Sequence, residues 1–136
     1  MSEMKTSDIE QQESKSTILT EEFALAQLND GLQSKTFTWN EIRAGDCHEV
    51  SGTVLLVSDG RGKFTCTTWT DHTHSGDVWH ASFTVLDRFG LTLFQFGGFD
   101  SPRMNDGGPR YPWEADFNYP AQHFDAAVSI TQYSSC

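Results

Sequence analysis

The sequence predicts an all-β fold, with a small antiparallel β-barrel as the first choice and a β-sandwich as the alternative. Beyond Gly31, short runs rich in Thr, Val, Phe and Trp alternate with Gly, Asp, Asn and Pro, a pattern typical of strands joined by turns. Several runs are apolar on both faces: Val54 and Leu56 alternate with Leu55 and Val57. A sheet with one solvated face alternates more cleanly, so two-sided burial favours a sheet closed on itself.

The N-terminal part of the chain predicts a tail and one helix. Residues 1–19 are polar and bury too little apolar surface to fold alone, which leaves residues 20–136 as a single domain of ordinary length. Thr20 has an N-capping side chain, acidic residues follow it, and Gly31 stands where a helix would end. These signals predict a short helix over residues 21–29.

Seven strands are expected after this helix, several of them joined by tight turns. Residues 59–62 (DGRG) give the strongest hairpin signal, and residues 73–77 and 88–90 predict two further turns, so four strands form an antiparallel meander. Residues 99–112 contain two Gly and three Pro and predict a long loop, which in compact domains is usually functional or disordered. The expected strands cover residues 35–39, 48–58, 63–71, 78–87, 91–96, 113–118 and 128–133.

Composition excludes several classes of protein. The net charge of -10 argues against binding to nucleic acid or to an anionic membrane surface. The longest apolar runs, such as residues 54–57, are far shorter than the roughly 20 residues that cross a bilayer. Residues 1–20 lack the apolar segment of a signal peptide, so the sequence predicts a cytoplasmic protein or one exported without such a signal.

The densest polar cluster lies in residues 69–80. His72 and His74 would project from the same face of an extended strand, a spacing that metal ligands use, and Asp71 and Asp77 could add a carboxylate. Turns also collect these residue types for conformational reasons, and no second cluster completes a site. We therefore expect no metal and no cofactor, and we interpret the cluster as a solvated turn.

Two residues are candidates for acid–base catalysis. His80 shares a strand face with Ser82, and Trp79 lies on the opposite face. If the face of Trp79 points outward, His80 points into a cavity where its imidazole suits proton transfer; in the reverse case it is an exposed strand residue. Asp116, which shares a face with Glu114 and follows an aromatic-rich loop, is the second candidate.

Aromatic and arginine side chains indicate where a ligand would bind. Such side chains gather in and after the loop of residues 99–112, and they are enriched in ligand pockets and protein interfaces. The same rings could instead close one end of the barrel as core residues. If there is a pocket, we expect the loop to cover its mouth. The residues expected to contact a substrate are Trp69, Trp79, Phe94, Phe96, Arg103, Tyr111 and Trp113.

Three short segments resemble a known group of proteins: T-F-T-W at residues 36–39, G-D-C at residues 45–47 and S-S-C at residues 134–136. They resemble a family of small, largely uncharacterised bacterial β-rich domains, whose members carry no settled activity. By architecture alone, the chain is also similar to small β-barrel cyclases and isomerases of natural-product pathways and to lipocalin-like carriers.

Two functions are therefore expected as alternatives. The first is a cofactor-free cyclase or isomerase acting on a small apolar molecule in an aromatic-lined pocket, because such a site works by shape and desolvation and leaves no motif. The second is a binding module for a small molecule or a protein, without catalytic activity. An enzyme needs a closed pocket with a polar residue, whereas an interaction module needs an exposed patch. Either could act as a homodimer.

The three cysteines are expected to have different roles. Cys47 opens the first long strand, and Cys136 ends the chain just after the last strand. Because the first and last strands of a barrel must meet, we expect their Cα atoms to lie within the ~4.4–6.8 Å that a disulfide spans. A cytoplasmic location would keep the thiols reduced, which leaves the bond itself open. Cys66 is expected to be buried and unpaired.

Overall fold

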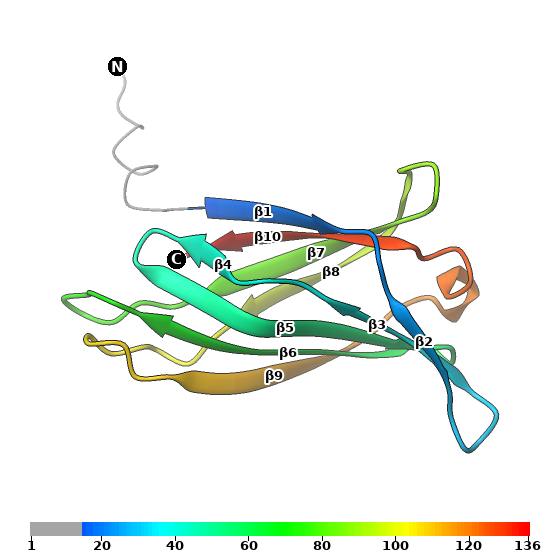
Figure 1. Ribbon diagram of the computed structural model, residues 1–136, viewed down its shortest axis with the longest axis horizontal. Coiled ribbons are helices and arrows are strands. Elements are labelled where there is room, and N and C mark those ends of the chain that lie inside the picture. The colour runs from blue at the N-terminus through cyan, green and yellow to red at the C-terminus, as the bar shows by residue number, and fades with distance from the viewer. Residues whose placement is uncertain (1–14) are drawn as a thin grey trace.

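Two antiparallel β-sheets form the structure, a computed structural model that describes residues 15–136 (Figure 1). One sheet has the strand order β1-β10-β7-β8, and the other has the order β2-β3-β5-β6-β9 with β4 also paired to β5. The four-stranded sheet contains β1 (Lys15–Thr20), β7 (His80–Leu86), β8 (Thr92–Asp100) and β10 (Ser129–Ser135). The six-stranded sheet contains β2 (Ala24–Gln27), β3 (Gln33–Thr38), β4 (Ile42–Ala44), β5 (Cys47–Val57), β6 (Arg61–Thr70) and β9 (Tyr111–Asn118).

The all-β prediction is confirmed, but the closed barrel is wrong: among residues 15–136 the two sheets stay separate, as in the β-sandwich alternative. A closed barrel would need ladders at both pairs of sheet edges; β8 and β9 form one such pair, and no hydrogen-bonded ladder connects them. Aromatic rings fill the space between these two edges. Phe96 of β8 stacks on Phe117 of β9 with ring centroids 3.8 Å apart. Side chains thus make the contact that backbone hydrogen bonds would make in a barrel.

A β-bulge changes which positions of β5 face the interior. Val50 pairs with Thr67 and Thr53 pairs with Thr65, so three steps along β5 match two steps along β6. Ser51, in the bulge, has φ 58°, in the left-handed region. The extra residue reverses which positions face the interior. The inward side chains are Cys47 and Glu49 before the bulge and Val54 and Leu56 after it.

The helix predicted over residues 21–29 is absent, because residues 24–27 form β2 and pair with β3. Leu25, which a helix would have placed on its apolar face, is 57% exposed. Gly31 has φ 86° and lies in the hairpin turn, where the backbone N–H of Leu28 donates to Leu32 O over 2.7 Å. Pairing with β3 provides partners for the backbone N–H and C=O groups, as a helix would. Strand pairing therefore overrides the local helix-capping signals. In the described part of the chain, no helix has the length and hydrophobicity needed to cross a bilayer.

Two segments expected to lack regular structure contain strands. Residues 15–19 of the predicted tail belong to β1, which pairs along its whole length with β10. The rest of that tail, residues 1–14, lies outside the described residues. The predicted loop of residues 99–112 is also shorter than expected, since β8 runs to Asp100 and β9 begins at Tyr111.

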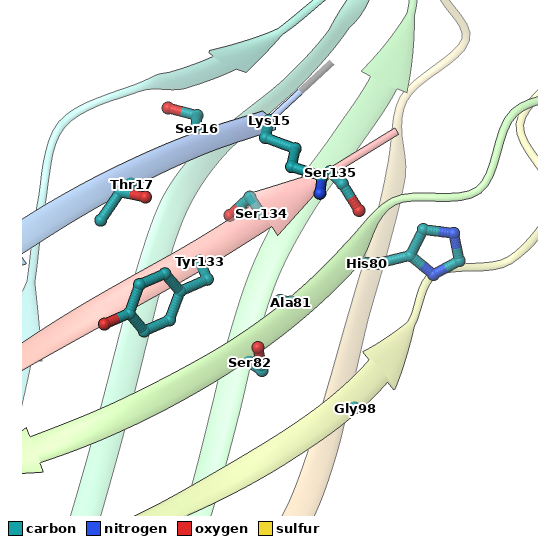
Figure 2. A pocket seen from close by; sticks show the side chains of 10 residues that line it. All are labelled: Lys15, Ser16, Thr17, His80, Ala81, Ser82, Gly98, Tyr133, Ser134 and Ser135. Carbon is teal, nitrogen blue, oxygen red and sulfur yellow. The ribbon is translucent and has the colours of Figure 1, made fainter. Parts of the chain in front are cut away.

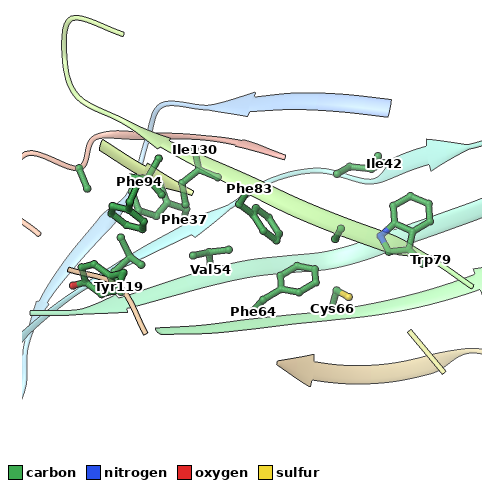
Figure 3. Close-up of a cluster of buried hydrophobic side chains, with 14 of the residues drawn as sticks. Phe37, Ile42, Val54, Phe64, Cys66, Trp79, Phe83, Phe94, Tyr119 and Ile130 are labelled. Atoms are coloured by element: carbon green, nitrogen blue, oxygen red, sulfur yellow. The ribbon is translucent and has the colours of Figure 1, made fainter. Parts of the chain in front are cut away.

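Aromatic side chains dominate the core between the sheets (Figure 3). Phe83 of the four-stranded sheet meets Phe64 of the six-stranded sheet with ring centroids 4.9 Å apart. Burying one such side chain contributes about 1.5–3 kcal/mol, so these contacts hold the two sheets together. The largest fully buried side chains include Trp79, Phe37, Phe64, Phe83, Leu56, Met104 and Ile130.

A buried lysine fixes the end of the sandwich that lies opposite the C-terminus (Figure 1). There a single 3-10 turn, η1 (Ala121–His123), leads toward β10. Lys35 Nζ donates to the carbonyl oxygens of Phe124, Asp125 and Ala127 over 2.6, 3.1 and 2.8 Å. Burial lowers the pKa of Lys35, and the three carbonyls replace the water that its ammonium loses.

Candidate functional site

A carboxyl group lies fully buried between the two sheets. Glu49 of β5 is 0% exposed, and its two oxygens accept hydrogen bonds from three side chains. Trp39 Nε1 donates to Oε2 over 2.8 Å, and Trp79 Nε1 and Gln132 Nε2 donate to Oε1 over 3.1 and 2.8 Å. Burial raises the pKa of Glu49, although the three hydrogen bonds act in the opposite direction. We call these four residues the Glu49 cluster; it links both sheets through polar contacts.

Two neighbouring groups complete the polar interior. Gln132 also donates from Nε2 to Ser134 Oγ over 2.9 Å, while its buried Oε1 has no hydrogen-bond partner. Cys66 of β6 is buried and unpaired, as predicted. Burial and the nearby Glu49 raise the pKa of the Cys66 thiol, so this side chain is held in its unreactive thiol form.

Gly52, in the bulge of β5, leaves the space that the Glu49 cluster needs. A Cβ atom at this position would lie 2.4 Å from Trp39 Nε1 and 2.6 Å from Glu49 Oε2. Gly52→Ala is therefore expected to break the Trp39–Glu49 hydrogen bond and to lower the free energy of unfolding by about 2–3 kcal/mol. Chemical denaturation measures the change. Gly90→Ala is the control: no atom lies within 4 Å of the added Cβ, although the φ of 80° strains any residue other than glycine. If Gly52→Ala lowers the free energy of unfolding no more than Gly90→Ala does, the steric argument is contradicted.

The connections before β7 and after β8 are joined at one end of the sandwich. Asp77 and Met104 form an antiparallel bridge, with N···O distances of 3.1 and 2.8 Å. Arg103 donates to the carbonyl oxygens of Ser75 and Gly76 over 3.2 and 3.4 Å. The expected cover loop is thus attached to its neighbouring loop.

The histidine pair singled out in the sequence lies on the exposed side of these loops. The rings of His72 and His74 are 5.6 Å apart, and His72 Nδ1 lies 3.3 Å from Asp106 Oδ1. Asp106 also accepts a hydrogen bond from the backbone N–H of Thr73 over 2.8 Å. The carboxylate therefore holds the turn as well as facing the imidazole.

Another histidine, His48 on β5, was not singled out by the sequence and is held by two carboxylates. Its Nδ1 lies 2.7 Å from Glu41 Oε2, and its Nε2 lies 2.7 Å from Asp71 Oδ2. The His48 ring stacks on Trp69 with centroids 4.7 Å apart, and the Arg110 guanidinium lies 3.6 Å from the Trp69 ring centroid. Trp69, expected to contact a substrate, is thereby covered by the protein itself.

The titration of Asp71 tests this arrangement. The hydrogen bond from His48 lowers the pKa of Asp71 below 3.8, its ordinary value. His48→Gln should raise the pKa of Asp71 toward that value, as measured by NMR titration of the carboxyl carbons. Because the pKa is lower in the folded state, Asp71 favours folding above its ordinary pKa, and this contribution is lost as the pH falls through the lowered value. His72→Gln is the control; identical Asp71 titrations in wild type and His48→Gln would contradict the interaction.

The outer face of the four-stranded sheet contains an open hollow of about 330 Å³ (Figure 2). Trp79 is buried and His80 is exposed. His80 therefore points outward into solvent and not into a cavity, the second of the two arrangements expected from the sequence. His80 Nδ1 lies 2.6 Å from Asp100 Oδ1. We call this site the Tyr133 hollow, after the half-exposed aromatic ring among its lining residues. Its outward-facing side chains are Lys15, Thr17, His80, Ser82, Tyr133 and Ser135.

Comparison with known proteins gives a family. A family model described as "Family of unknown function (DUF6294)" matches residues 53–136. The chain belongs to this family. The resemblance to an uncharacterised family that the sequence indicated is confirmed by this match. No curated protein matches the chain.

The residues matched by the DUF6294 model include the lining of the Tyr133 hollow, apart from the lining residues on β1. Glu49 and Cys47 lie before the first matched residue. The two predicted catalytic residues are not brought together. His80 lies on the outer face of the four-stranded sheet, and Asp116 lies on the outer face of β9 in the other sheet, with Oδ1 3.6 Å from Lys63 Nζ.

The expected substrate-contacting residues of this DUF6294 chain are likewise dispersed. Trp79 belongs to the Glu49 cluster, and Phe94 stacks on Tyr119 with centroids 5.0 Å apart. Trp113 Nε1 donates to Thr68 Oγ1 over 3.0 Å. Tyr111, Phe96 and Arg103 also contact protein groups, in the loops or between the sheet edges.

Proposed function

We propose that this DUF6294 protein is a binding module without catalytic activity, and that the Tyr133 hollow binds a neutral ring rich in hydroxyl groups, such as one unit of an oligosaccharide. The observation that carries the proposal is the combination of a half-exposed aromatic ring with polar side chains along its edge. Tyr133 is 48% exposed, and Figure 2 shows its ring nearly face-on. A sugar ring has the matching chemistry, with an apolar C–H face and polar edges.

Strand register arranges the hollow as two parallel rows of outward side chains. In the first row Thr17, Tyr133 and Ser82 lie directly opposite one another on β1, β10 and β7. The second row is displaced by two residues along each strand, roughly 7 Å away. It places Ser135 opposite His80, which in turn lies opposite Asp100. A ring stacked on Tyr133 would therefore reach hydroxyl and imidazole groups at its edge.

The net charge of the chain favours a neutral ligand over a polyanion. Among residues 15–136, the hollow itself is lined by one cation, Lys15, and by no carboxylate; Asp100 lies outside the lining, 2.6 Å from the His80 imidazole. The chain as a whole carries a net charge of -10, which repels polyanions. Imidazole groups hydrogen-bond well to hydroxyl groups, which both donate and accept.

The cofactor-free cyclase expected from the sequence would need a pocket among the aromatic residues. The rings expected to line such a pocket instead pack against one another and against protein side chains: Phe83 stacks on Phe96 with centroids 4.8 Å apart. The Tyr133 hollow is open to solvent, and open hollows suit binding better than a reaction that excludes water. These contacts favour the binding alternative.

Calorimetric titration with neutral oligosaccharides of glucose, xylose, mannose and N-acetylglucosamine tests the proposal. At least one should bind, and Tyr133→Ala should weaken that binding by about tenfold or more, because the stacking surface is removed. Phe89→Ala, which removes another exposed ring (72% exposed) on the β7–β8 turn, is the matched control and should leave the affinity unchanged. Absence of binding across the panel, or equal affinity of wild type and Tyr133→Ala, would overturn the proposal.

A further inference from the structure

Three ligand atoms meet at the end of the sandwich where the chain terminates. Cys47 Sγ, Cys136 Sγ and a carboxylate oxygen of Asp77 all lie within 4.8 Å of one another. The two cysteines form a disulfide with a Cα–Cα distance of 6.2 Å, and Cys47 Sγ lies 3.7 Å from Asp77 Oδ2. Cys47 is buried, and the other two residues are half-buried. A carboxylate thus faces both sulfur atoms.

The carboxylate of Asp77 is held in place by its surroundings. Thr70 Oγ1 donates to Oδ2 over 2.6 Å, and Thr73 Oγ1 donates to Oδ1 over 3.1 Å. The backbone of Asp77 is fixed by its bridge to Met104. Among residues 15–136, no lysine or arginine forms an ion pair with Asp77. Hydroxyl groups that orient a carboxylate without neutralising it are the kind of outer contacts that support metal ligands.

We propose that the reduced protein binds one zinc-like divalent cation through the two thiolates and Asp77, so that this corner of the fold alternates between a disulfide and a metal site. This inference is independent of ligand binding in the Tyr133 hollow. Zinc bonds of about 2.3 Å to sulfur and 2.0–2.2 Å to oxygen give a tetrahedral S···O separation of about 3.6 Å, close to the observed 3.7 Å. With the disulfide reduced, the distance between the two sulfur atoms bound to the cation would be about 3.8 Å.

The exchange between the two states balances with a dithiol as reductant. The dithiol transfers two electrons and two protons to the Cys47–Cys136 bond, and its own sulfur atoms become a disulfide. Two protein thiols result, and the cation displaces both thiol protons as it binds. Three protein ligands leave one position for water. A reducing compartment would maintain the dithiol state, and an oxidising one would maintain the disulfide.

Cobalt titration tests the proposal, because Co²⁺ substitutes for zinc and thiolate coordination gives an intense charge-transfer absorption. Protein reduced with a dithiol and freed of it under anaerobic conditions should bind one Co²⁺, and Zn²⁺ should remove the absorption. The oxidised protein should show none. Cys136→Ser should lose most of the charge-transfer intensity, and Asp77→Asn should weaken binding by about tenfold or more.

Matched controls separate this site from the other thiol and from the histidine pair. Cys66→Ser and the double variant His72→Ala, His74→Ala should bind Co²⁺ as wild type does. The proposal is overturned if reduced protein with free Cys47 and Cys136 gives no charge-transfer absorption, or if Cys136→Ser and Asp77→Asn bind as tightly as wild type. Far-UV circular dichroism monitors folding, and loss of sheet signal on reduction that Co²⁺ does not restore also overturns it.

Discussion

Replacing Glu49 with alanine is expected to lower the free energy of unfolding by about 4 kcal/mol, because the change leaves three buried N–H donors without an acceptor. Each buried donor that loses its partner costs roughly 1–3 kcal/mol, and the costs do not add fully because the donors share one site. The missing side chain also leaves space between the sheets. Urea denaturation followed by circular dichroism measures the change.

Two further variants separate the hydrogen bonds from the volume of the side chain. Glu49→Gln keeps the shape but places an amide N–H against an indole or amide donor, and we expect a loss of about 2 kcal/mol. Glu114→Gln changes an exposed residue of β9 and should alter stability by less than about 0.5 kcal/mol. If Glu49→Ala is no more destabilising than Glu114→Gln, the Glu49 cluster does not hold the sheets together.

The pH dependence of these variants has a defined sign. Burial raises the pKa of Glu49 in the folded protein above 4.5, its ordinary value. The folded state then binds this proton more tightly than the unfolded state does. The stability that Glu49 contributes is therefore fully present below the ordinary pKa and is lost as the pH rises through the raised value. The advantage of wild type over Glu49→Gln should shrink as the pH rises, and an advantage that grows would contradict the raised pKa.

Local sequence patterns predict β3 and β5 to β10 and several of the turns between them, but they miss β1, β2 and β4. The glycine-rich turn after β5 is a hairpin connection, where Gly60 has φ 100° and a Cβ atom would lie 2.9 Å from Tyr119 O. Such turns need glycine, so the sequence shows them directly. The order of strands in space depends instead on pairing between distant segments. The absence of ladders between the two sheets, at β8 and β9 for example, has no local signature.

The Glu49 cluster was missed for the same reason. Trp39, Glu49, Trp79 and Gln132 come from four separate segments and meet only when the two sheets pack. One local signal was present. Strand alternation places Glu49 on the same face as Cys47, and a residue expected to form a disulfide at the end of the core implies that its face points inward. An acidic residue two positions further along that face is a candidate buried carboxyl.

The disulfide gives the second large expected effect. Replacing Cys47 and Cys136 together with serine should lower the free energy of unfolding by about 4 kcal/mol in metal-free buffer, because the bond closes a loop between residues 89 apart in sequence. The Cα distance of 6.2 Å falls within the expected range, but the reason differs from barrel closure. Cys47 begins β5 of the six-stranded sheet, and Cys136 follows β10 of the other, so the bond joins the two sheets at one end.

Denaturant dependence shows whether this effect arises in the unfolded or the folded chain. A crosslinked unfolded chain is more compact, so removing the bond should increase the m-value as well as lower the midpoint. Oxidised Cys66→Ser, which keeps the bond, is the control and should retain the wild-type m-value. A double variant with an unchanged m-value and a loss below about 1 kcal/mol would contradict the loop-closure argument. The aromatic core and the Glu49 cluster would then hold the two sheets together without the bond. Reduction of the wild type would leave both sheets in place, with two free thiols beside Asp77.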